Sequence, residues 1–120
     1  MKRIIFNLKR EWYDKIASGE KTVEYRLAAP YWGKRLCYKL SVFCGWFNPY
    51  APKTSPQCFR PEDWFAVFRL GYSRKHHDIV RRIVKIDIGP CPYDGWDGEY
   101  FRIHFEPNSV RSSGLEGAAK

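Results

Sequence analysis

The chain has 120 residues, of which 44% are hydrophobic and 18% aromatic, so it can fold as one domain with its own core. Its 21 Lys and Arg outnumber 13 Asp and Glu, and the net charge of +8 favours anionic partners such as RNA, DNA or nucleotides, unless it serves solubility alone. No apolar run approaches the roughly 20 residues of a membrane helix, which argues against a membrane-spanning protein.

Cysteine usage favours a reducing compartment. The four cysteines are Cys37, Cys44, Cys58 and Cys91. They form no C-x-x-C pair and no zinc-ligand spacing, and no signal peptide precedes them, because the chain begins directly with MKRIIFNLK. We therefore expect a cytoplasmic protein with four reduced thiols and no cofactor. A disulfide, or a metal site that includes His76 or His77, is the less favoured alternative.

The N-terminal quarter predicts a strand, a helix and a second strand. Apolar and polar residues alternate over residues 4–9, as in a strand with one buried face. Residues 10–18 change to helical spacing with one apolar stripe, and Gly19 follows as the expected helix stop. Residues 22–27 then predict the second strand.

The middle of the chain predicts a short helix or turn, a strand and a long loop. Pro30 begins the turn or helix PYWGKR, and alternation over residues 36–43 predicts a third strand. Residues 45–61 contain four prolines, Pro49, Pro52, Pro56 and Pro61. Such a segment predicts a long loop of the kind that often carries function.

Three further strands are predicted before apolar periodicity ends. Alternation indicates strands at residues 66–72, 79–88 and 99–105, and GPCPYDGWDG is a turn-rich connection between the last two. The expected inward residues of the fifth strand are Val80, Val84, Ile86 and Ile88. The pattern predicts an α+β domain over residues 1–106, namely a small, mostly antiparallel barrel of five to six strands with one main helix after the first strand. Residues 107–120 are expected to form a flexible tail.

The outward positions of the later strands carry basic side chains. The expected basic face consists of Arg69, Arg81, Lys85 and Arg102, with His104 and Lys39 beside them. Neighbouring strands would gather these side chains into a surface for nucleic acid. Ordinary solubility of exposed strands explains the same pattern equally well.

The run SGEKTVEYR concentrates charge at the start of the second strand. On an extended strand Glu24 and Arg26 share one face, where an ion pair would orient the guanidinium. The opposite face carries the better core candidates, Val23 and Tyr25. Lys21 would join Glu24 if the chain enters the strand irregularly. The alternative is a surface salt bridge contributing less than about 1 kcal/mol.

The segment from Gly19 to Arg26 resembles the G-x-K-x-x-E-x-R signature of the ASCH (activating signal cointegrator homology) domains, which are related to PUA folds. The longer run NLKREWYDKIASGEKTVEYR is similar to the opening of small bacterial and phage members. PYWGKRL and the pair Gly71-Tyr72 are also similar to the family. The resemblance is dense over residues 4–44 and partial over 65–88, and it covers neither the Pro-rich insert nor His76-His77.

This resemblance implies a PUA-like barrel with a cleft beside the first helix and an RNA or nucleotide-like ligand. Lys21, Glu24 and Arg26 would line the cleft, and Gly19 would permit the turn. Some members of the family are amidohydrolases that remove acyl groups from modified cytidines, and others cleave RNA. The amidohydrolases have threonine at the position of Glu24, a difference that speaks against the same activity here.

A binding module is therefore the first functional hypothesis. Aromatic side chains near the cleft would stack on bases, and the candidates are Trp12, Tyr31, Trp32, Trp46 and Tyr72. Arg26, Lys34 and Arg35 would contact phosphate.

A small hydrolase is the second hypothesis. Lys21 would act as base or nucleophile, Glu24 would move a proton or activate water, and Arg26 would stabilise developing negative charge. No Ser-His-Asp or metal motif supports another catalytic mechanism. A protein-binding or inhibitor role is a third alternative, and we favour the binding module.

Overall fold

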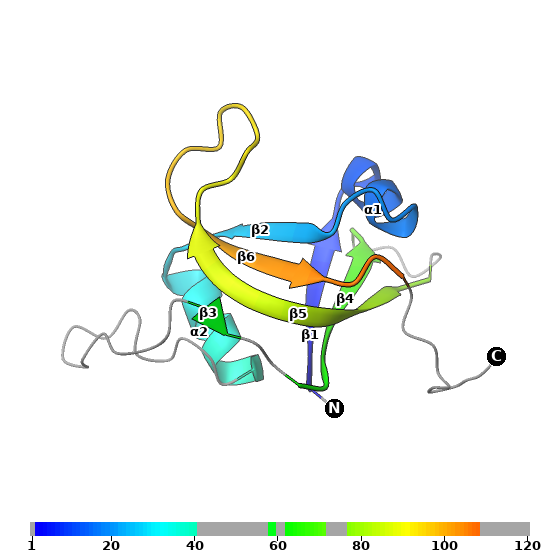
Figure 1. The fold of residues 1–120 in the computed structure, drawn as a ribbon, viewed down its shortest axis with the longest axis horizontal. Helices are drawn as coiled ribbons and strands as arrows, with labels where there is room; N and C mark the ends of the chain where they lie inside the picture. Colours follow the sequence, from blue (N-terminus) through cyan, green and yellow to red (C-terminus); the bar gives the residue numbers. More distant parts are fainter. Residues whose placement is uncertain (1, 41–57, 60–61, 72–76, 109–120) are drawn as a thin grey trace.

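A computed structural model describes residues 2–40, 58–59, 62–71 and 77–108 (Figure 1). Its elements in chain order are β1 (Lys2–Leu8), α1 (Arg10–Ala17), β2 (Val23–Leu27), α2 (Pro30–Leu40), β3 (Cys58–Phe59), β4 (Trp64–Leu70), β5 (Ile79–Gly89) and β6 (Tyr100–Phe105). The protein is a small α+β domain in which a curled mixed sheet forms a half-barrel accompanied by two helices. The expected barrel-like α+β architecture is confirmed at this level.

The sheet order places the first two strands at opposite edges. The order is β1-β4-β5-β6-β2, and the short β3 pairs with β5 outside this path. β1 pairs with β4 in parallel, whereas the β4–β5, β5–β6, β6–β2 and β3–β5 pairs are antiparallel. Because the sheet curls, its two edges approach each other, and Figure 1 shows β2 crossing close to β1.

The core fills the concave side of the half-barrel. Its fully buried apolar side chains come from four strands and both helices, and they include Ile4, Phe6, Ile16, Leu36, Leu40, Phe68, Ile83, Ile86, Phe101 and Ile103. The Phe68 ring lies 5.6 Å from that of Phe6 and 4.8 Å from that of Phe105, which joins opposite parts of the curled sheet. α1 and α2 lie at different ends of the sheet (Figure 1). Each buries one stripe, as an amphipathic helix must.

The third predicted strand is wrong over residues 36–40, which belong to α2. Gly33, Leu36 and Leu40 are its buried residues, at the three- and four-residue spacing of one helix face. The same positions fit an alternating pattern locally, because Leu36 and Leu40 are also an even number of residues apart. Within the predicted Pro-rich loop, residues 58–59 form β3, and the rest of residues 45–61 lies outside the described residues.

The inward face of β5 also differs from the prediction. Its register shifts between Ile83 and Lys85, at an irregularity of the β-bulge type. Ile83 and Ile86 are therefore buried, whereas Val84 is 45% exposed. An alternation drawn through the whole strand cannot anticipate the added residue.

Two further expectations concern the thiols and the membrane. Cys37 is disulfide-bonded, so the prediction of four reduced thiols is wrong, whereas Cys91 is a free thiol. Among the described residues, no helix is long and apolar enough to cross a membrane. Residues 109–120 of the predicted tail lie outside the described residues.

Candidate functional site

The three ionic side chains of the motif converge on Glu24. The Lys21 Nζ lies 3.4 Å from Glu24 Oε1, and the Arg26 Nη2 lies 2.9 Å from Glu24 Oε2. Lys21 and Glu24 are only 8% and 6% exposed. The predicted convergence is therefore confirmed, and the pair is buried instead of lying on the surface.

The convergence occurs on the inner face of the sheet. Glu24 is opposite Ile103 and Arg26 is opposite Phe101 in the β2–β6 pair, and both partners are fully buried. Opposite residues of an antiparallel pair share a face, so the charged side chains project toward the core. The prediction that Val23 and Tyr25 face the core is thus wrong, because their partners are the half-buried His104 and Arg102.

A left-handed turn delivers Lys21 to this face. Gly19 has a φ of +87°, a conformation that glycine adopts at little cost, and its N–H donates to the Ile16 carbonyl at 3.1 Å. The Lys21 N–H then donates to the Lys15 carbonyl at 3.0 Å. The helix therefore ends where predicted, and the chain enters β2 irregularly.

Three aromatic rings surround the Lys21 ammonium, and we refer to Trp12, Tyr25 and Tyr93 as the aromatic cage. The Lys21 Nζ lies 4.9 Å from the Trp12 ring, 5.4 Å from Tyr25 and 5.3 Å from Tyr93. It also donates a hydrogen bond to the Tyr93 hydroxyl at 3.3 Å. Ring faces attract cations, and here they assist Glu24 in holding the ammonium.

Both cage tyrosines are held as neutral phenols. Burial raises the pKa of Tyr25, and the neighbouring Tyr93 and Cys91 raise it further. Burial likewise raises the pKa of Tyr93, with further contributions from Cys91 and Glu24. The Tyr93 hydroxyl therefore keeps its proton and accepts the lysine N–H through its oxygen lone pair.

Arg26 connects the two edges of the half-barrel. It belongs to β2, yet its Nη2 donates to the Asn7 carbonyl of β1 at 3.2 Å. Its guanidinium also lies 5.2 Å from the Phe6 ring and 4.9 Å from the Trp32 ring. The Arg26 Nε is buried without a hydrogen-bond partner among the described residues. Arg26 is thus held by contacts with both edges of the half-barrel.

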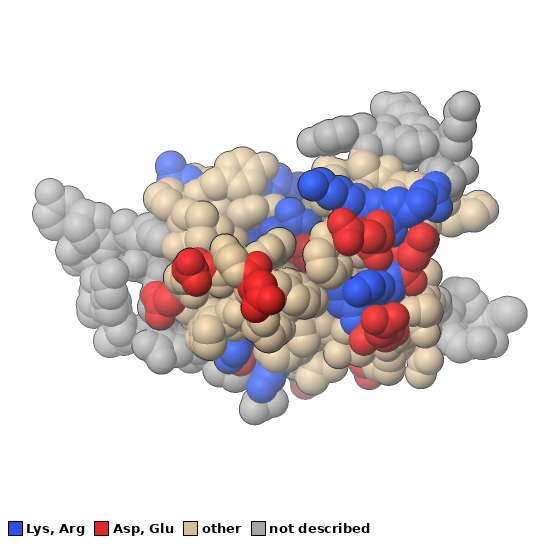
Figure 2. Space-filling model, turned by 90° about the horizontal axis from the view of Figure 1, so that it is seen from above, with Lys and Arg blue, Asp and Glu red and all other residues tan. Residues whose placement is uncertain are grey.

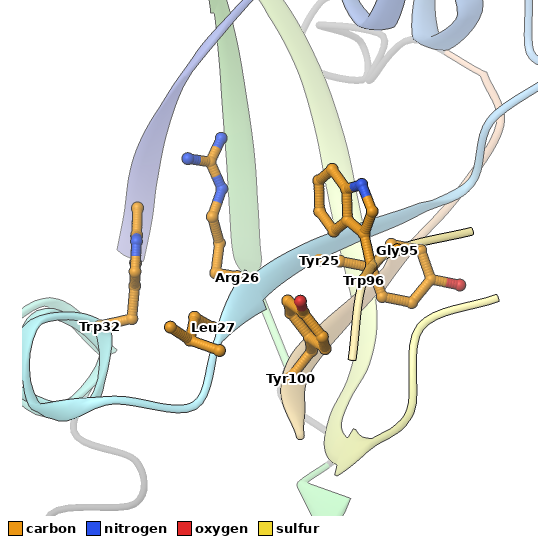
Figure 3. A pocket seen from close by; sticks show the side chains of 7 residues that line it. All are labelled: Tyr25, Arg26, Leu27, Trp32, Gly95, Trp96 and Tyr100. Carbon is orange, nitrogen blue, oxygen red and sulfur yellow. The ribbon is translucent and has the colours of Figure 1, made fainter. Parts of the chain in front are cut away.

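An open pocket of about 470 Å³ adjoins this arginine (Figure 3). It is lined by Tyr25, Arg26, Leu27, Trp32, Gly95, Trp96 and Tyr100. Figure 3 shows Trp32 on one side and Trp96 with Tyr100 on the other, with Leu27 between them. The Trp96 ring lies 5.5 Å from Tyr93, so the pocket wall continues into the aromatic cage. Lys21 and Glu24 do not line this pocket. Glu24 contacts Arg26, and Lys21 contacts Glu24.

The sequence pattern does not indicate several of these residues. Tyr93 and Trp96 lie in the connection between β5 and β6, where the sequence predicts only turns, and alternation places Tyr25 in the core. The available signal was the presence of two large aromatic residues among Gly, Pro and Asp in GPCPYDGWDG. Large rings in such a loop need something to pack against.

The predicted ligand residues of α2 occupy different environments. Trp32 lines the pocket, and the Arg35 guanidinium lies 5.2 Å from its ring and 5.8 Å from the Tyr31 ring. Tyr31 is 65% exposed, and Lys34 is exposed. Two other stacking candidates, Trp46 and Tyr72, lie outside the described residues.

The expected basic face is not assembled as predicted, because Arg81 is buried. Arg81 is 3% exposed and donates from Nη2 to the Ile16 carbonyl at 3.1 Å. It is paired with Ala66, a small core residue that leaves room for the long side chain on the inner face. Its burial lowers the pKa of the guanidinium.

The other members of that face are neutralised by aspartates. Arg69 forms two hydrogen bonds with Asp78, at 3.0 and 2.8 Å. Arg102 does the same with Asp87, at 2.7 and 3.0 Å. Asp87 also has Lys85 at 3.8 Å and His104 at 3.2 Å. Figure 2, which views the molecule from above, shows acidic side chains directly beside basic ones on that side of the molecule too.

Comparison with known proteins returned no match to a family model, a curated protein or a solved structure. In the described ranges, no group of three His, Cys, Asp or Glu side chains could hold a metal ion. Function is therefore inferred from the charged cluster, the aromatic cage and the pocket.

Proposed function

We propose that this chain is an ASCH-like domain with a PUA-like fold that binds RNA or a nucleotide-like ligand in the pocket beside Arg26. The observation that carries the proposal is a guanidinium placed between aromatic walls, with Trp32 on one side and Trp96 and Tyr100 on the other. Flat rings on opposite walls suit a flat ligand. A nucleobase would stack on the exposed Trp96 ring, because the Trp32 ring already stacks on Phe6, and the arginine would donate to a phosphate or a base edge.

The charged cluster supports this role by holding Arg26 in place. Glu24 holds the Arg26 guanidinium from one side, and the Asn7 carbonyl holds it from another. The Trp32 ring packs against the same guanidinium. Lys21 and its aromatic cage in turn fix Glu24. A side chain with so many contacts is preorganised, so ligand binding costs little rotamer entropy.

The alternative is a hydrolase, and the buried contact between Lys21 and Glu24 favours it. A nucleophilic amine must be neutral, however, and Lys21 has a carboxylate and three ring faces around its nitrogen. Those contacts favour a cation. Neither Lys21 nor Glu24 lines the pocket. We therefore favour a binding function over a catalytic one.

Nucleotide binding is tested by tryptophan fluorescence titration with the four nucleoside monophosphates and the corresponding nucleosides. Trp96→Ala should weaken both kinds of ligand by about 5- to 150-fold, because stacking on one aromatic ring contributes about 1–3 kcal/mol. Arg26→Lys should weaken the monophosphates more than the nucleosides, since it removes the planar donor fork. Tyr38→Ala is the matched control, because Tyr38 is 83% exposed and does not line the pocket.

Two outcomes would change the proposal. Absence of any monophosphate binding at millimolar concentration, in a folded protein, would overturn it. Turnover of an N4-acylated cytidine or of RNA that Lys21→Ala and Glu24→Ala abolish without weakening binding would establish the hydrolase instead.

A further inference from the structure

One face of α2 combines cations with exposed tyrosines. It consists of Tyr31, Lys34, Arg35, Tyr38 and Lys39, which we call the α2 outer face. Their spacing of three, four, seven and eight residues places them along one side of a helix. Tyr31 and Tyr38 are 65% and 83% exposed, both lysines are exposed, and Arg35 is half-buried.

Acidic side chains do not neutralise this face within the described structure. α2 contains no Asp or Glu, and none lies between Glu24 and Glu62 in the sequence. No ion pair among the described residues includes Lys34, Arg35 or Lys39. The strand arginines Arg69 and Arg102, by contrast, are each bound to an aspartate. Three cations of α2 therefore lie close together without an acidic partner in the part of the chain that the structure describes, whereas the sequence placed the basic surface on the sheet.

The α2 outer face is continuous with the pocket. Trp32 lines the pocket from the first turn of the helix, and Arg35 lies 5.2 Å from its ring and 5.8 Å from the ring of Tyr31. Tyr31 and Tyr38 are seven residues apart, which is about 10 Å along the helix axis. Stacked nucleotides rise about 3.4 Å each, so the face has the length of about three of them.

We infer that the α2 outer face binds the sugar-phosphate backbone of a single-stranded nucleic acid whose leading base occupies the pocket. This inference rests on the proposed function, and it names the ligand as a strand instead of a mononucleotide. Cations interleaved with exposed rings are the combination that tracks single strands, because the cations contact phosphates while the rings stack on bases. A membrane-binding helix would instead present aliphatic side chains, and Leu36 and Leu40 are buried.

The test compares uridine monophosphate with a ten-residue oligouridylate at several salt concentrations. The variant is Lys34→Glu/Lys39→Glu, and the matched control is Arg3→Glu/Lys9→Glu, which changes the net charge equally at exposed positions of β1 and its junction with α1. The α2 variant should weaken binding of the oligomer more than binding of uridine monophosphate. Two lost phosphate contacts should reduce the salt slope by about 1.4, so the affinity defect at 50 mM salt should be roughly sevenfold larger than at 200 mM.

Tyr38 provides a second readout that does not depend on charge. Tyr38→Ser should weaken binding of the oligomer but not of the monophosphate, and Tyr38→Phe should retain oligomer binding, because the stacking ring remains. Equal oligomer affinity and salt slope in the α2 variant and the control would overturn the inference while leaving the pocket proposal intact. Absence of monophosphate binding to the wild-type protein would overturn the pocket proposal itself. Tighter, Lys34- and Lys39-dependent binding to phosphatidylserine vesicles than to the oligomer would assign the face to an anionic membrane.

Discussion

At the scale of single residues, Glu24 is the centre of the charged cluster. A carboxylate that is 6% exposed is costly to bury unless it is paired and hydrogen-bonded. Here Lys21 and Arg26 approach different oxygens of the same group. Removing the shared anion would leave two cations in a poorly solvated site, so Glu24 has a structural role as well as a positioning role.

Glu24→Gln, which keeps the size of the side chain, should lower the free energy of unfolding by about 3 kcal/mol, measured by urea denaturation. The matched control is Glu20→Gln in the neighbouring turn. Glu20 pairs with Lys15 at 3.8 Å, but these side chains are 67% and 46% exposed, so its loss should cost less than about 1 kcal/mol. Equal effects of the two substitutions would show that the Glu24 cluster behaves as a surface ion pair.

The sequence predicted the members of this cluster but not the face they occupy. The spacing of Glu24 and Arg26 on a strand places them on one side, and Gly19 signals the turn that brings Lys21 to them. Alternation alone assigns charged residues to solvent and Tyr25 to the core. The actual arrangement is inverted, because mutual neutralisation lets the charges face inward, and no single residue reveals that compensation.

At the scale of elements, Arg81 attaches α1 to the sheet. The last carbonyls of a helix lack partners within the helix, and the Arg81 guanidinium donates to the one at Ile16. A cation at a helix C-terminus also interacts favourably with the helix dipole. A residue predicted to contact nucleic acid is therefore placed to hold the helix that carries the Trp12 ring of the cage.

Arg81→Leu should destabilise the protein by about 1–3 kcal/mol, because it removes a buried hydrogen bond from a charged donor to the Ile16 carbonyl, which would keep only the Gly19 N–H. Hydrogen exchange should be fastest to respond in the amides of α1. Arg82→Leu is the control at the adjacent position, where the side chain is 42% exposed and its ion-pair distances are 3.6 and 3.9 Å. A larger loss of stability in Arg82→Leu than in Arg81→Leu would contradict the anchoring role.

α2 shows why element type is hard to predict in short segments. Leu36, Tyr38 and Leu40 satisfy a strand pattern, and Gly33, Leu36 and Leu40 satisfy a helix pattern. Packing on the core decides between them, because Leu36 and Leu40 are both fully buried while Tyr38 is 83% exposed. Because residues 36–40 are helical, Lys39 lies on the α2 outer face and not on the expected sheet face.

At the scale of the whole molecule, stability should depend on pH through Asp87. Burial tends to raise the pKa of this carboxyl, but hydrogen bonds from Arg102 and His104 outweigh burial and lower it. Asp78 has a lowered pKa too, chiefly because of the Arg69 hydrogen bond. Folded molecules then bind fewer protons than unfolded ones between the folded and unfolded pKa values, so this stabilisation is present above about pH 4 and is lost at lower pH.

Asp87→Asn should therefore be less stable than wild type at pH 7, and the difference should shrink as the pH falls from about 5 toward 2. Urea denaturation midpoints measured across this range would check the prediction. A difference that stays constant with pH would mean that the Asp87 charge does not stabilise the fold.

The pairing of β2 with β6 dictates when the site can exist during synthesis. Residues 21–26 are synthesised well before Ile103 and Phe101, which lie opposite Glu24 and Arg26 in the sheet. Tyr93 also follows late, so a nascent chain that stops before residue 93 holds Lys21 without one wall of its cage. The charged residues of the motif therefore stay solvated until β6 is made, and truncation after β5 would abolish the proposed ligand binding although the whole motif is present.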